Sequence, residues 1–319
     1  MRIGLDVSGG DFAPKSTLHG ALLALKDLSK NDRIVLIGDK DVINSFFKEE
    51  NVDPFRFDVV DATDQIEMGE SPTKALVAKP NSSIAVGFRM LKHKEIHSFS
   101  SAGNSGAMMV GAIYSVNSIQ GVIRPSTPAY IPQEGGGSTI LIDVGTNPDS
   151  KPDVMYQFGL LGSLYAEHVM HVKNPRVGLL NIGTEEKKGN LITQSSFQLM
   201  RDAKDFNFIG NVEGRDLFRD RVDVIVCDGF VGNIVLKQAE ALYRVFVKRG
   251  IKDDYLDRFN YENYGGSPIL GINSNVLVGH GISNGKAIRR MILLSKEIHN
   301  ARLTNKIKHA FEKYAINNI

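Results

Sequence analysis

The sequence predicts an α/β protein built on a mostly parallel sheet that is doubly wound, with helices on both faces. Short apolar runs of strand type alternate with helical patterns along nearly the whole chain, which is typical of repeated β-α units. The longer strand candidates are apolar throughout, as expected of strands covered on both faces. These two observations define the fold class.

Four strands are predicted in the first half of the chain, over residues 2–7, 33–38 and 55–60 and near Ser98. The helical pattern after the first strand has its apolar residues on one face, at Leu18, Ala21, Leu22, Leu25 and Leu28. The first strand is therefore expected to lead into a helix that covers the sheet.

Capping residues and prolines divide the rest of this half. Asp39 is a suitable cap for the second helix. Residues 71–81 contain two prolines and are expected to form a loop. Asn81 or Ser82 then caps a helix that ends near Lys94.

The second half continues the alternation, with strands predicted over residues 139–144, 176–182, 223–227 and 275–279. Residues 124–137 are rich in Pro and Gly and lack periodicity, so they are expected to form a loop or an irregular arm. No linker composition separates independent domains. The expectation is one domain over residues 1–319, with two lobes as a variant of it.

Composition narrows the class of protein. The chain has 319 residues, 42% hydrophobic and 23% charged, which suits a globular enzyme with a large core. A net charge of +2 gives no field that favours nucleic acid as a partner. With Cys227 as the one cysteine, neither an internal disulfide nor a cysteine-based zinc site can form. No apolar run has membrane-spanning length and no signal peptide is recognised, so a cytoplasmic location is expected.

One event recurs six times: a strand ends in a polar, glycine-containing turn and a helix follows. The turns are residues 5–11, 101–107, 142–148, 181–190, 227–233 and 278–285. Ligands of open α/β sheets bind beyond the carboxyl ends of the strands, where glycine exposes backbone N–H groups and helix N-termini favour anions. Any single turn is more simply a plain β-to-α connection, but six on one sheet favour a phosphate-binding site.

Reactive side chains occur at the same strand ends. Asp6 could orient a nucleophile or only bond its own turn, and Asn104 could donate to a phosphate or a carbonyl or only favour the turn. Lys187 and Lys188 lie in a charged run between two glycines, where one lysine could point into the site. Asp228 follows its strand directly.

Standard nucleotide-binding and nucleophile motifs are absent, which narrows the classes of function that the sequence supports. The first strand is not followed by a dinucleotide fingerprint, and residues 281–286 depart from a nucleotide-binding loop in spacing and in the Ser or Thr that holds magnesium. Residues 103–106 are one residue short of a nucleophile elbow. Cys227 is expected to be a packed residue rather than a nucleophile. No cluster has metal-ligand spacing, so no metal site is expected.

Taken together, the motifs resemble the bacterial phosphate acyltransferase family (PlsX). They are LDVSGGDFAP (5–14), SAGNSGA (101–107), LIDVG (141–145), GLLNIGTEEKKG (178–189), FIGNVE (208–213), DGFVGN (228–233) and YGG (264–266). The resemblance runs in order from residue 1 to about residue 286.

The resemblance implies a fold related to phosphate acetyltransferases and to isocitrate/isopropylmalate dehydrogenases, a homodimer, and no metal or organic cofactor. It implies that acyl phosphate is made from an acyl carrier protein thioester and inorganic phosphate, as a first step of phospholipid synthesis. A membrane glycerol-3-phosphate acyltransferase would then use the product.

Two departures from the family pattern matter. The first turn has Phe12 where the family usually has histidine, so no role transfers to that position. Residues 237–261 are shorter than the family segment linked to membrane docking. At most weak, peripheral membrane contact is therefore expected.

The chemistry of thioester attack by phosphate assigns provisional roles. Lys188, with Lys187 as the alternate, would stabilise negative charge, and Asp228 would align or deprotonate phosphate. The other binding candidates are Asp6, Gly9, Gly10, Asn104, Gly106, Asn233 and His280. An acidic carrier protein would need a basic surface, for which the candidates are Arg244, Lys248, Arg249, Lys252, Arg289 and Arg290.

Two alternatives stay open. A relative in the same class could transfer a short acyl group from coenzyme A to phosphate. A decarboxylating dehydrogenase that uses a nicotinamide cofactor belongs to a different class and would need metal-binding aspartates.

Apolar stripes at residues 242–246 and 288–298 are expected to contribute to a dimer.

Overall fold

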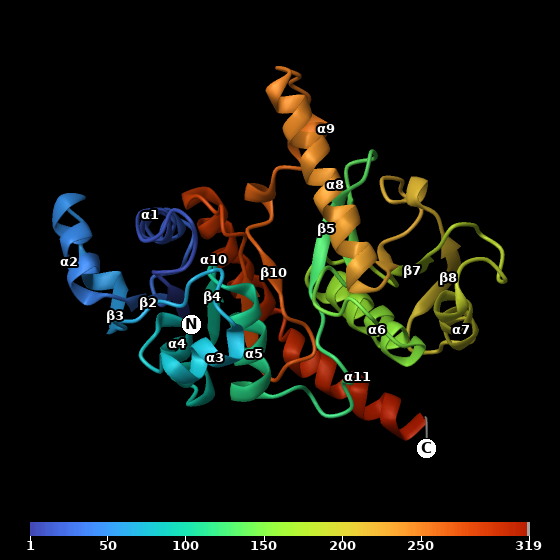
Figure 1. The fold of residues 1–319 in the computed structure, drawn as a ribbon, viewed down its shortest axis with the longest axis horizontal. Helices are drawn as coiled ribbons and strands as arrows, with labels where there is room; N and C mark the ends of the chain where they lie inside the picture. Colours follow the sequence, from blue (N-terminus) through green and yellow to red (C-terminus); the bar gives the residue numbers. More distant parts are fainter. Residues whose placement is uncertain (318–319) are drawn as a thin grey trace. The chain divides into compact units, whose positions relative to one another are not determined.

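The computed structural model describes residues 1–317 and divides into two compact units. Unit 1 combines residues 1–117 with 261–300, and unit 2 combines residues 118–260 with the chain from 301 onward. Each unit has its own sheet (Figure 1). The α/β class and the mostly parallel sheets are confirmed, but the expectation that all six turns share one sheet is wrong.

Unit 1 contains a six-stranded sheet in the order β10-β11-β4-β1-β2-β3, in which only β10 is antiparallel to its neighbour. The strands are β1 (Arg2–Asp6), β2 (Arg33–Gly38), β3 (Phe57–Asp61), β4 (Ser98–Ser101), β10 (Ser267–Pro268) and β11 (Asn275–Val278). They agree with the predicted strands to within two residues, except that β10 was not predicted.

Helices of unit 1 cover its sheet. They are α1 (Lys15–Ala24), α2 (Lys40–Glu49), α3 (Pro72–Ala78), α4 (Ser83–Lys92), α5 (Ser105–Val116) and α10 (Gly285–Asn300). α1 packs against α10 so closely that a Cβ on Gly20 would lie 2.4 Å from Cβ of Ile288. α4 packs against α5, and its Phe88 meets Phe99 of β4 edge to face at 5.2 Å in a hydrophobic core cluster.

Local capping explains where two of these helices begin. Asp39 accepts N–H bonds from Asp41 and Val42 at the start of α2, and Ser82 accepts one from Ala85 at the start of α4. The predicted loop over 71–81 is wrong, because α3 begins at Pro72. Proline at the first helical position loses no hydrogen bond, so it starts this helix instead of breaking it.

Unit 2 contains a five-stranded sheet in the order β5-β6-β9-β7-β8, with β5 antiparallel at the edge. The strands are β5 (Pro128–Pro132), β6 (Ser138–Ile142), β7 (Arg176–Leu180), β8 (Asn207–Val212) and β9 (Val224–Val226). The prediction of an irregular arm over 124–137 is wrong for β5. The two prolines at its ends are tolerated because the strand pairs on one side only.

Four helices accompany this sheet, namely α6 (Pro152–His168), α7 (Leu191–Met200), α8 (Gly229–Lys248) and α11 (Leu303–Asn317). α6 packs on strands β6, β7 and β9, and a second core cluster joins the sheet to Val235 and Leu236 of α8. The short helix α9 (Asp254–Asp257) follows the far end of α8 (Figure 1).

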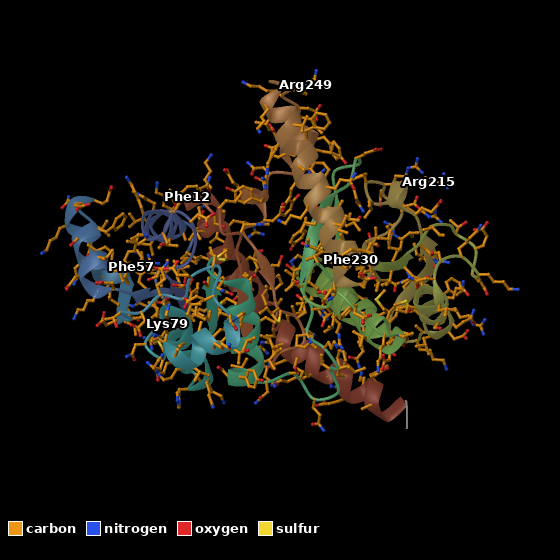
Figure 2. All side chains as sticks on the ribbon, viewed as in Figure 1. Phe12, Phe57, Lys79, Arg215, Phe230 and Arg249 are labelled. Carbon is orange, nitrogen blue, oxygen red and sulfur yellow. The ribbon has the colours of Figure 1, made fainter. Side chains whose placement is uncertain are left out.

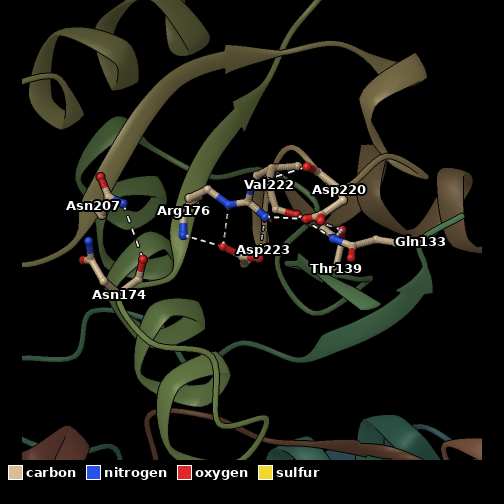
Figure 3. Close-up of polar contacts among 8 residues, drawn as sticks. All are labelled: Gln133, Thr139, Asn174, Arg176, Asn207, Asp220, Val222 and Asp223. Atoms are coloured by element: carbon tan, nitrogen blue, oxygen red, sulfur yellow. Dashed lines mark hydrogen bonds and ion pairs between the residues drawn. The ribbon is translucent and has the colours of Figure 1, made fainter. Parts of the chain in front are cut away.

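Polar side chains lock the amino-terminal edge of the unit 2 sheet (Figure 3). Arg176 at the start of β7 bonds both carboxylate oxygens of Asp223, which precedes β9, at 2.9 and 3.0 Å. Thr139 and Gln133 donate to the carbonyl of Val222. These contacts fix the register of neighbouring strands at the edge opposite the glycine turns.

The two predicted apolar stripes differ in how far they are buried. On α10 the stripe is buried inside unit 1, at Ile288, Met291, Ile292, Leu294 and Ile298, so it leaves no surface for a partner and its expected role in a dimer is wrong. On α8, Leu242 and Val245 stay half exposed. Among the described residues, no helix is both long and apolar enough to span a membrane.

Candidate functional site

The six glycine turns divide equally between the two sheets. Those at 5–11, 101–107 and 278–285 follow the neighbouring strands β1, β4 and β11 of unit 1. Those at 142–148, 181–190 and 227–233 follow β6, β7 and β9 of unit 2. The predicted site residues therefore form two groups, one at the carboxyl edge of each sheet.

The group in unit 1 lies where the strand order reverses. From β1 the chain proceeds to β2 and β3 on one side and then returns to β4 on the other side of β1. Such a switch point leaves a crevice beyond the strand ends, because the successive connections lead away from it in opposite directions. The turns after β1 and β4 stand on either side of this switch point.

Asp6, at the end of β1, is 1% exposed and has protein partners at both carboxylate oxygens. Ser8 N–H donates to Oδ1 at 2.9 Å and Ser101 Oγ donates to Oδ2 at 2.6 Å. Burial raises the pKa of this carboxyl above its ordinary value, and the hydrogen bonds offset part of the increase. The side chain thus holds two turns together from inside the unit.

Gly9 and Gly10 are required by close approach and by backbone conformation. A Cβ on Gly9 would lie 2.4 Å from Oδ2 of Asp6 and 2.7 Å from the backbone N of Gly103. Gly10 has a φ of 109°, which favours glycine, and Asp11 N–H donates to the carbonyl of Gly281 at 2.7 Å. All three turns of unit 1 are thereby tied to one another.

Asn104 has partners within the protein at both ends of its amide. Oδ1 caps α5 by accepting from Ala107 N–H at 2.9 Å, and Nδ2 donates to the carbonyls of Glu67 and Glu70 at 2.9 and 3.1 Å. At Gly106 a Cβ would lie 2.5 Å from Cγ of Pro72. These residues seat α3 and α5 at the crevice, and a ligand contact by Asn104 would compete with bonds already made.

His280 lies at the third turn, with its ring 5.6 Å from the ring of Tyr261. Tyr261 in turn donates its hydroxyl to the carbonyl of Ile282 at 2.9 Å. The same turn contains Ser283, which sequence reasoning missed. Its Oγ is buried and has no hydrogen-bond partner within the described residues 1–317.

The group in unit 2 is formed by two adjacent strands. β7 and β9 are parallel, with Leu179 paired to Val226. Asn181 and Asp228 each stand two residues after that pair, so the two turns leave the sheet about 4.8 Å apart, the usual spacing of neighbouring strands. The lysine turn and the Asp228 turn thus lie next to each other.

Amide side chains brace the lysine turn. Asn181 Nδ2 donates to the carbonyl of Lys188 at 3.1 Å, and Asn211 Nδ2 donates to the carbonyl of Glu185 at 2.9 Å. A Cβ on Gly183 would lie 2.9 Å from Cγ of Lys188, so the lysine stem lies against Gly183 within the turn. Lys187 and Lys188 are both exposed, and two of the three atoms nearest to that Cβ position belong to Lys188.

Asp228 is the N-cap of α8 and is only partly buried. Its Oδ1 accepts from Val231 N–H at 2.8 Å, which satisfies one unpaired donor at the start of this 20-residue helix. Asn233, one turn further along α8, is exposed and flanks Gly145 of the neighbouring turn. This edge therefore combines cations, a carboxylate and a helix N-terminus.

Asp143 is a residue of this edge that sequence reasoning did not select. It follows β6 and is fully buried, and its oxygens accept from Ser126 Oγ at 2.7 Å and from Asn147 N–H at 2.6 Å. Burial raises the pKa of its carboxyl. The signal that selected Asp6 and Asp228, an aspartate at the carboxyl end of a strand, applies equally to Asp143.

Cys227 is a packed residue, as predicted. It is 3% exposed, and burial raises the pKa of its thiol well above the ordinary value. Within residues 1–317 no three His, Cys, Asp or Glu side chains are placed to hold a metal ion.

Comparison with known proteins identifies relatives over nearly the whole chain. The family described as "Fatty acid synthesis protein" matches residues 1–255. The phosphate acyltransferase of Halothermothrix orenii is 39% identical, over 98% of this chain and 99% of its own. That of Syntrophomonas wolfei is 40% identical, over 95% and 96%.

Solved structures support the fold alone, because their sequence identity is low. A phosphotransacetylase from Streptococcus pyogenes superimposes with a TM-score of 0.64 at 13% identity and covers 94% of each chain. The EutD phosphotransacetylase from Staphylococcus aureus gives a TM-score of 0.61 at 15% identity, over 93% of this chain and 94% of its own.

Proposed function

Because this chain belongs to the phosphate acyltransferase family of fatty acid synthesis proteins, we propose that it transfers an acyl group from a thioester to inorganic phosphate. The donor is a long-chain acyl thioester of acyl carrier protein, and the product is acyl phosphate for the first step of phospholipid synthesis. The observation that carries the proposal is the adjacency of the Lys188 and Asp228 turns at the ends of β7 and β9.

The reaction needs no nucleophile from the protein. A phosphate oxygen attacks the thioester carbonyl, the C–S bond of the tetrahedral intermediate breaks, and the released thiolate takes up a proton. Near neutral pH inorganic phosphate still carries a titratable proton. Asp228 accepts this proton or aligns the attacking oxygen. The Lys188 ammonium stabilises the oxyanion, because an exposed cation held by a braced turn is already in place when charge develops.

Unit 1 contributes a second set of residues to the proposal. Asp6, Gly9, Gly10, Asn104, Gly106 and His280 shape the crevice at its switch point. The binding role of these residues stays a prediction, as does that of Asn233 in unit 2. No residue of either set is assigned to a metal or an organic cofactor.

The decisive experiment incubates the purified protein with palmitoyl-acyl carrier protein and phosphate. The expected result is release of carrier thiol that depends on phosphate, together with acyl phosphate that hydroxylamine traps as hydroxamate. Thiol release at the same rate without phosphate would identify a thioesterase instead. A chelator should leave the rate unchanged.

The short-chain alternative is decided by the same assay with a different donor. If acetyl or butyryl coenzyme A supports faster acyl phosphate formation than palmitoyl-acyl carrier protein, the donor assignment is wrong. Hydride transfer to a nicotinamide cofactor in place of phosphate acylation would contradict the enzyme class.

The proposed carrier-protein surface is narrower than the sequence suggested. Arg289 is paired with Asp27 at 2.8 Å and Arg290 with Glu297 at 2.6 Å, so these two arginines are partly neutralised. Lys248, Arg249 and Lys252 are exposed at the far end of α8, where Figure 2 labels Arg249. An acidic carrier protein would bind there with an affinity that falls as salt rises.

A homodimer and weak membrane contact complete the proposal. With the apolar stripe of α10 buried, the proposed dimer surface is the predicted stripe on α8, where Leu242 and Val245 are half exposed. Equilibrium sedimentation should give a dimer, and a concentration-independent monomer would contradict it. The protein is proposed to be cytoplasmic, and tight binding to liposomes by the isolated protein would contradict that location.

A further inference from the structure

The lysine turn, residues 181–190, contains no helix or strand, yet amide side chains bind the carbonyls on both sides of its second lysine. Gln194 Nε2 donates to the carbonyls of Lys187 and Gly189, each at 3.0 Å. Asn181 Nδ2 donates to the carbonyl of Lys188, between them, at 3.1 Å. Because a side-chain amide nitrogen carries two hydrogens, Gln194 can serve both of its carbonyls at once. Three consecutive carbonyls around Lys188 are therefore held by side chains.

These bonds fix the backbone of Lys188. The peptide group before it contains the Lys187 carbonyl, bound by Gln194, and the Lys188 N–H, which donates to the carbonyl of Glu185 at 3.1 Å. The peptide group after it contains the Lys188 carbonyl, bound by Asn181. Since peptide groups are planar, holding both of them fixes φ and ψ of Lys188, and with them the direction of its Cα–Cβ bond.

The neighbouring Lys187 is held on one side only. Gln194 binds the carbonyl of the peptide group that follows Lys187. In the peptide group that precedes it, neither the Glu186 carbonyl nor the Lys187 N–H has a hydrogen-bond partner within residues 1–317. Of the two adjacent lysines, Lys188 is thus the one whose backbone is fixed on both sides.

Gln194 belongs to α7, and this helix is itself anchored in unit 2. The buried ring of Phe197 on α7 packs edge to face against Phe208 of β8 at 5.5 Å. Asn190, the last residue of the lysine turn, caps the helix by accepting from Thr193 N–H at 2.9 Å. A side chain on a packed helix holds a loop more precisely than a contact from another loop would.

We propose that Gln194 is a positioning residue for the acyl transfer, because it fixes the backbone from which the Lys188 ammonium reaches the developing oxyanion. The inference rests on the proposed function and adds to it a residue that acts through Lys188 and not on the substrate. Gln194 makes two of the three carbonyl bonds around this lysine. Misplacement of a catalytic group by about 1 Å can cost about 100-fold in rate, so loss of these bonds should be visible in kcat.

Gln194→Met tests the proposal, because methionine keeps the length of the side chain and the helix propensity but has no N–H to donate. Gln198→Met makes the same exchange one turn further along α7, at an exposed position, and is the matched control. kcat should fall about tenfold or more in Gln194→Met and less than about twofold in Gln198→Met, with KM for phosphate and the melting temperature nearly unchanged in both. If Gln194→Met does not fold, Gln194→Ala takes its place. Unchanged kcat in a folded Gln194 variant overturns the proposal.

A double-mutant cycle shows whether Gln194 acts through Lys188. In the Lys188→Ala background, Gln194→Met should lower kcat less than about twofold further, because no ammonium is left to position. A residue that only supports the general structure of the site would cost the same factor with or without the lysine. An equal factor in the two backgrounds therefore overturns the positioning role.

Limited digestion with trypsin separates this inference from the proposed function. Trypsin cleaves after Lys187 and Lys188 when the lysine turn opens, and the carbonyl bonds from Gln194 oppose this opening. Fragments that end at these two lysines should form at least about threefold faster in Gln194→Met than in the wild type or in Gln198→Met. Equal rates in all three proteins overturn the proposal. If the wild type makes no acyl phosphate, the proposed function fails, and the digestion alone decides whether Gln194 holds the lysine turn.

Discussion

The carboxyl edges of the two sheets carry the same kind of turn but use their polar side chains differently. In unit 1, Asp6 and Asn104 bond neighbouring turns and helices, and both are nearly inaccessible to solvent. In unit 2, Lys188 is exposed and Asp228 uses one oxygen for a helix cap while remaining partly accessible. At the edge in unit 1 the polar side chains hold the turns together, whereas the edge in unit 2 presents charged groups.

This difference shows that position after a strand does not decide the role of a residue. Asp6 ends a strand, and Asp143 and Asp228 follow one, yet Asp6 and Asp143 are buried with hydrogen bonds at their oxygens and Asp228 is accessible. A buried carboxylate that accepts several hydrogen bonds is a structural element unless a ligand replaces one of them. The comparison therefore predicts catalytic effects for unit 2 variants and stability effects for unit 1 variants.

The largest effect is expected for Lys188→Ala. Loss of a preorganised cation at the oxyanion should lower kcat by at least about 100-fold while the exposed position leaves thermal stability nearly unchanged. Lys187→Ala is the matched control and should retain most activity, because Lys188 is the lysine whose stem lies nearest to Gly183. Near-normal turnover in folded Lys188→Ala would remove this residue from the site.

Asp228→Asn should have the next largest effect, again about 100-fold or more in kcat, because general-base or alignment roles contribute at this level. Asparagine caps helices as well as aspartate does, so α8 should keep its start and the melting temperature should barely change. Asp39→Asn exchanges the same two residues at the cap of α2 and should be fully active. Equal turnover of wild type and Asp228→Asn would contradict the assignment.

Gly9→Ala should act on stability instead. A Cβ at this position meets an oxygen of Asp6, the backbone of Gly103 and Oγ of Ser101, all within 2.8 Å, so one of the turns must shift. The expected cost is about 1–3 kcal/mol in the free energy of unfolding, measured by urea denaturation. Gly69→Ala is the control, since no atom lies within 4 Å of its Cβ position. Equal urea midpoints for Gly9→Ala and Gly69→Ala would argue against close packing of the turns at Gly9.

The smallest effect is a pH dependence at Asp6. In the unfolded chain this carboxyl ionises near pH 4, whereas burial raises its pKa in the folded protein, so the folded state retains the proton to higher pH. Its contribution to stability is full below about pH 4 and is lost as the pH rises through the folded pKa.

Asp6→Asn removes this titration. Relative to wild type, the variant should therefore gain melting temperature as the pH is raised from about 4 to 7. Asp149→Asn, at an exposed site, should follow the wild type at every pH. A constant difference between Asp6→Asn and wild type would show that the carboxyl keeps an ordinary pKa.

Local sequence determined much of this protein. The alternation of apolar runs and turns predicts the α/β class and nearly all parallel strands, because burial on both faces requires continuous apolar strands. Caps such as Asp39 and Ser82 define helix starts through bonds to residues two or three positions away. Lys188 and Asp228 could be selected because charged residues after strands are recognisable without knowledge of contacts.

Only the tertiary structure decided how those elements are combined. Strands 95 residues apart, β1 and β4, become neighbours, and Asp6 then bonds Ser101. The division of six turns between two sheets, the edge pairing that admits the prolines of β5, and the burial of the α10 stripe are long-range outcomes as well. The physical reason is that pairing and burial depend on which surfaces meet, and periodicity along one segment carries no information about its partner.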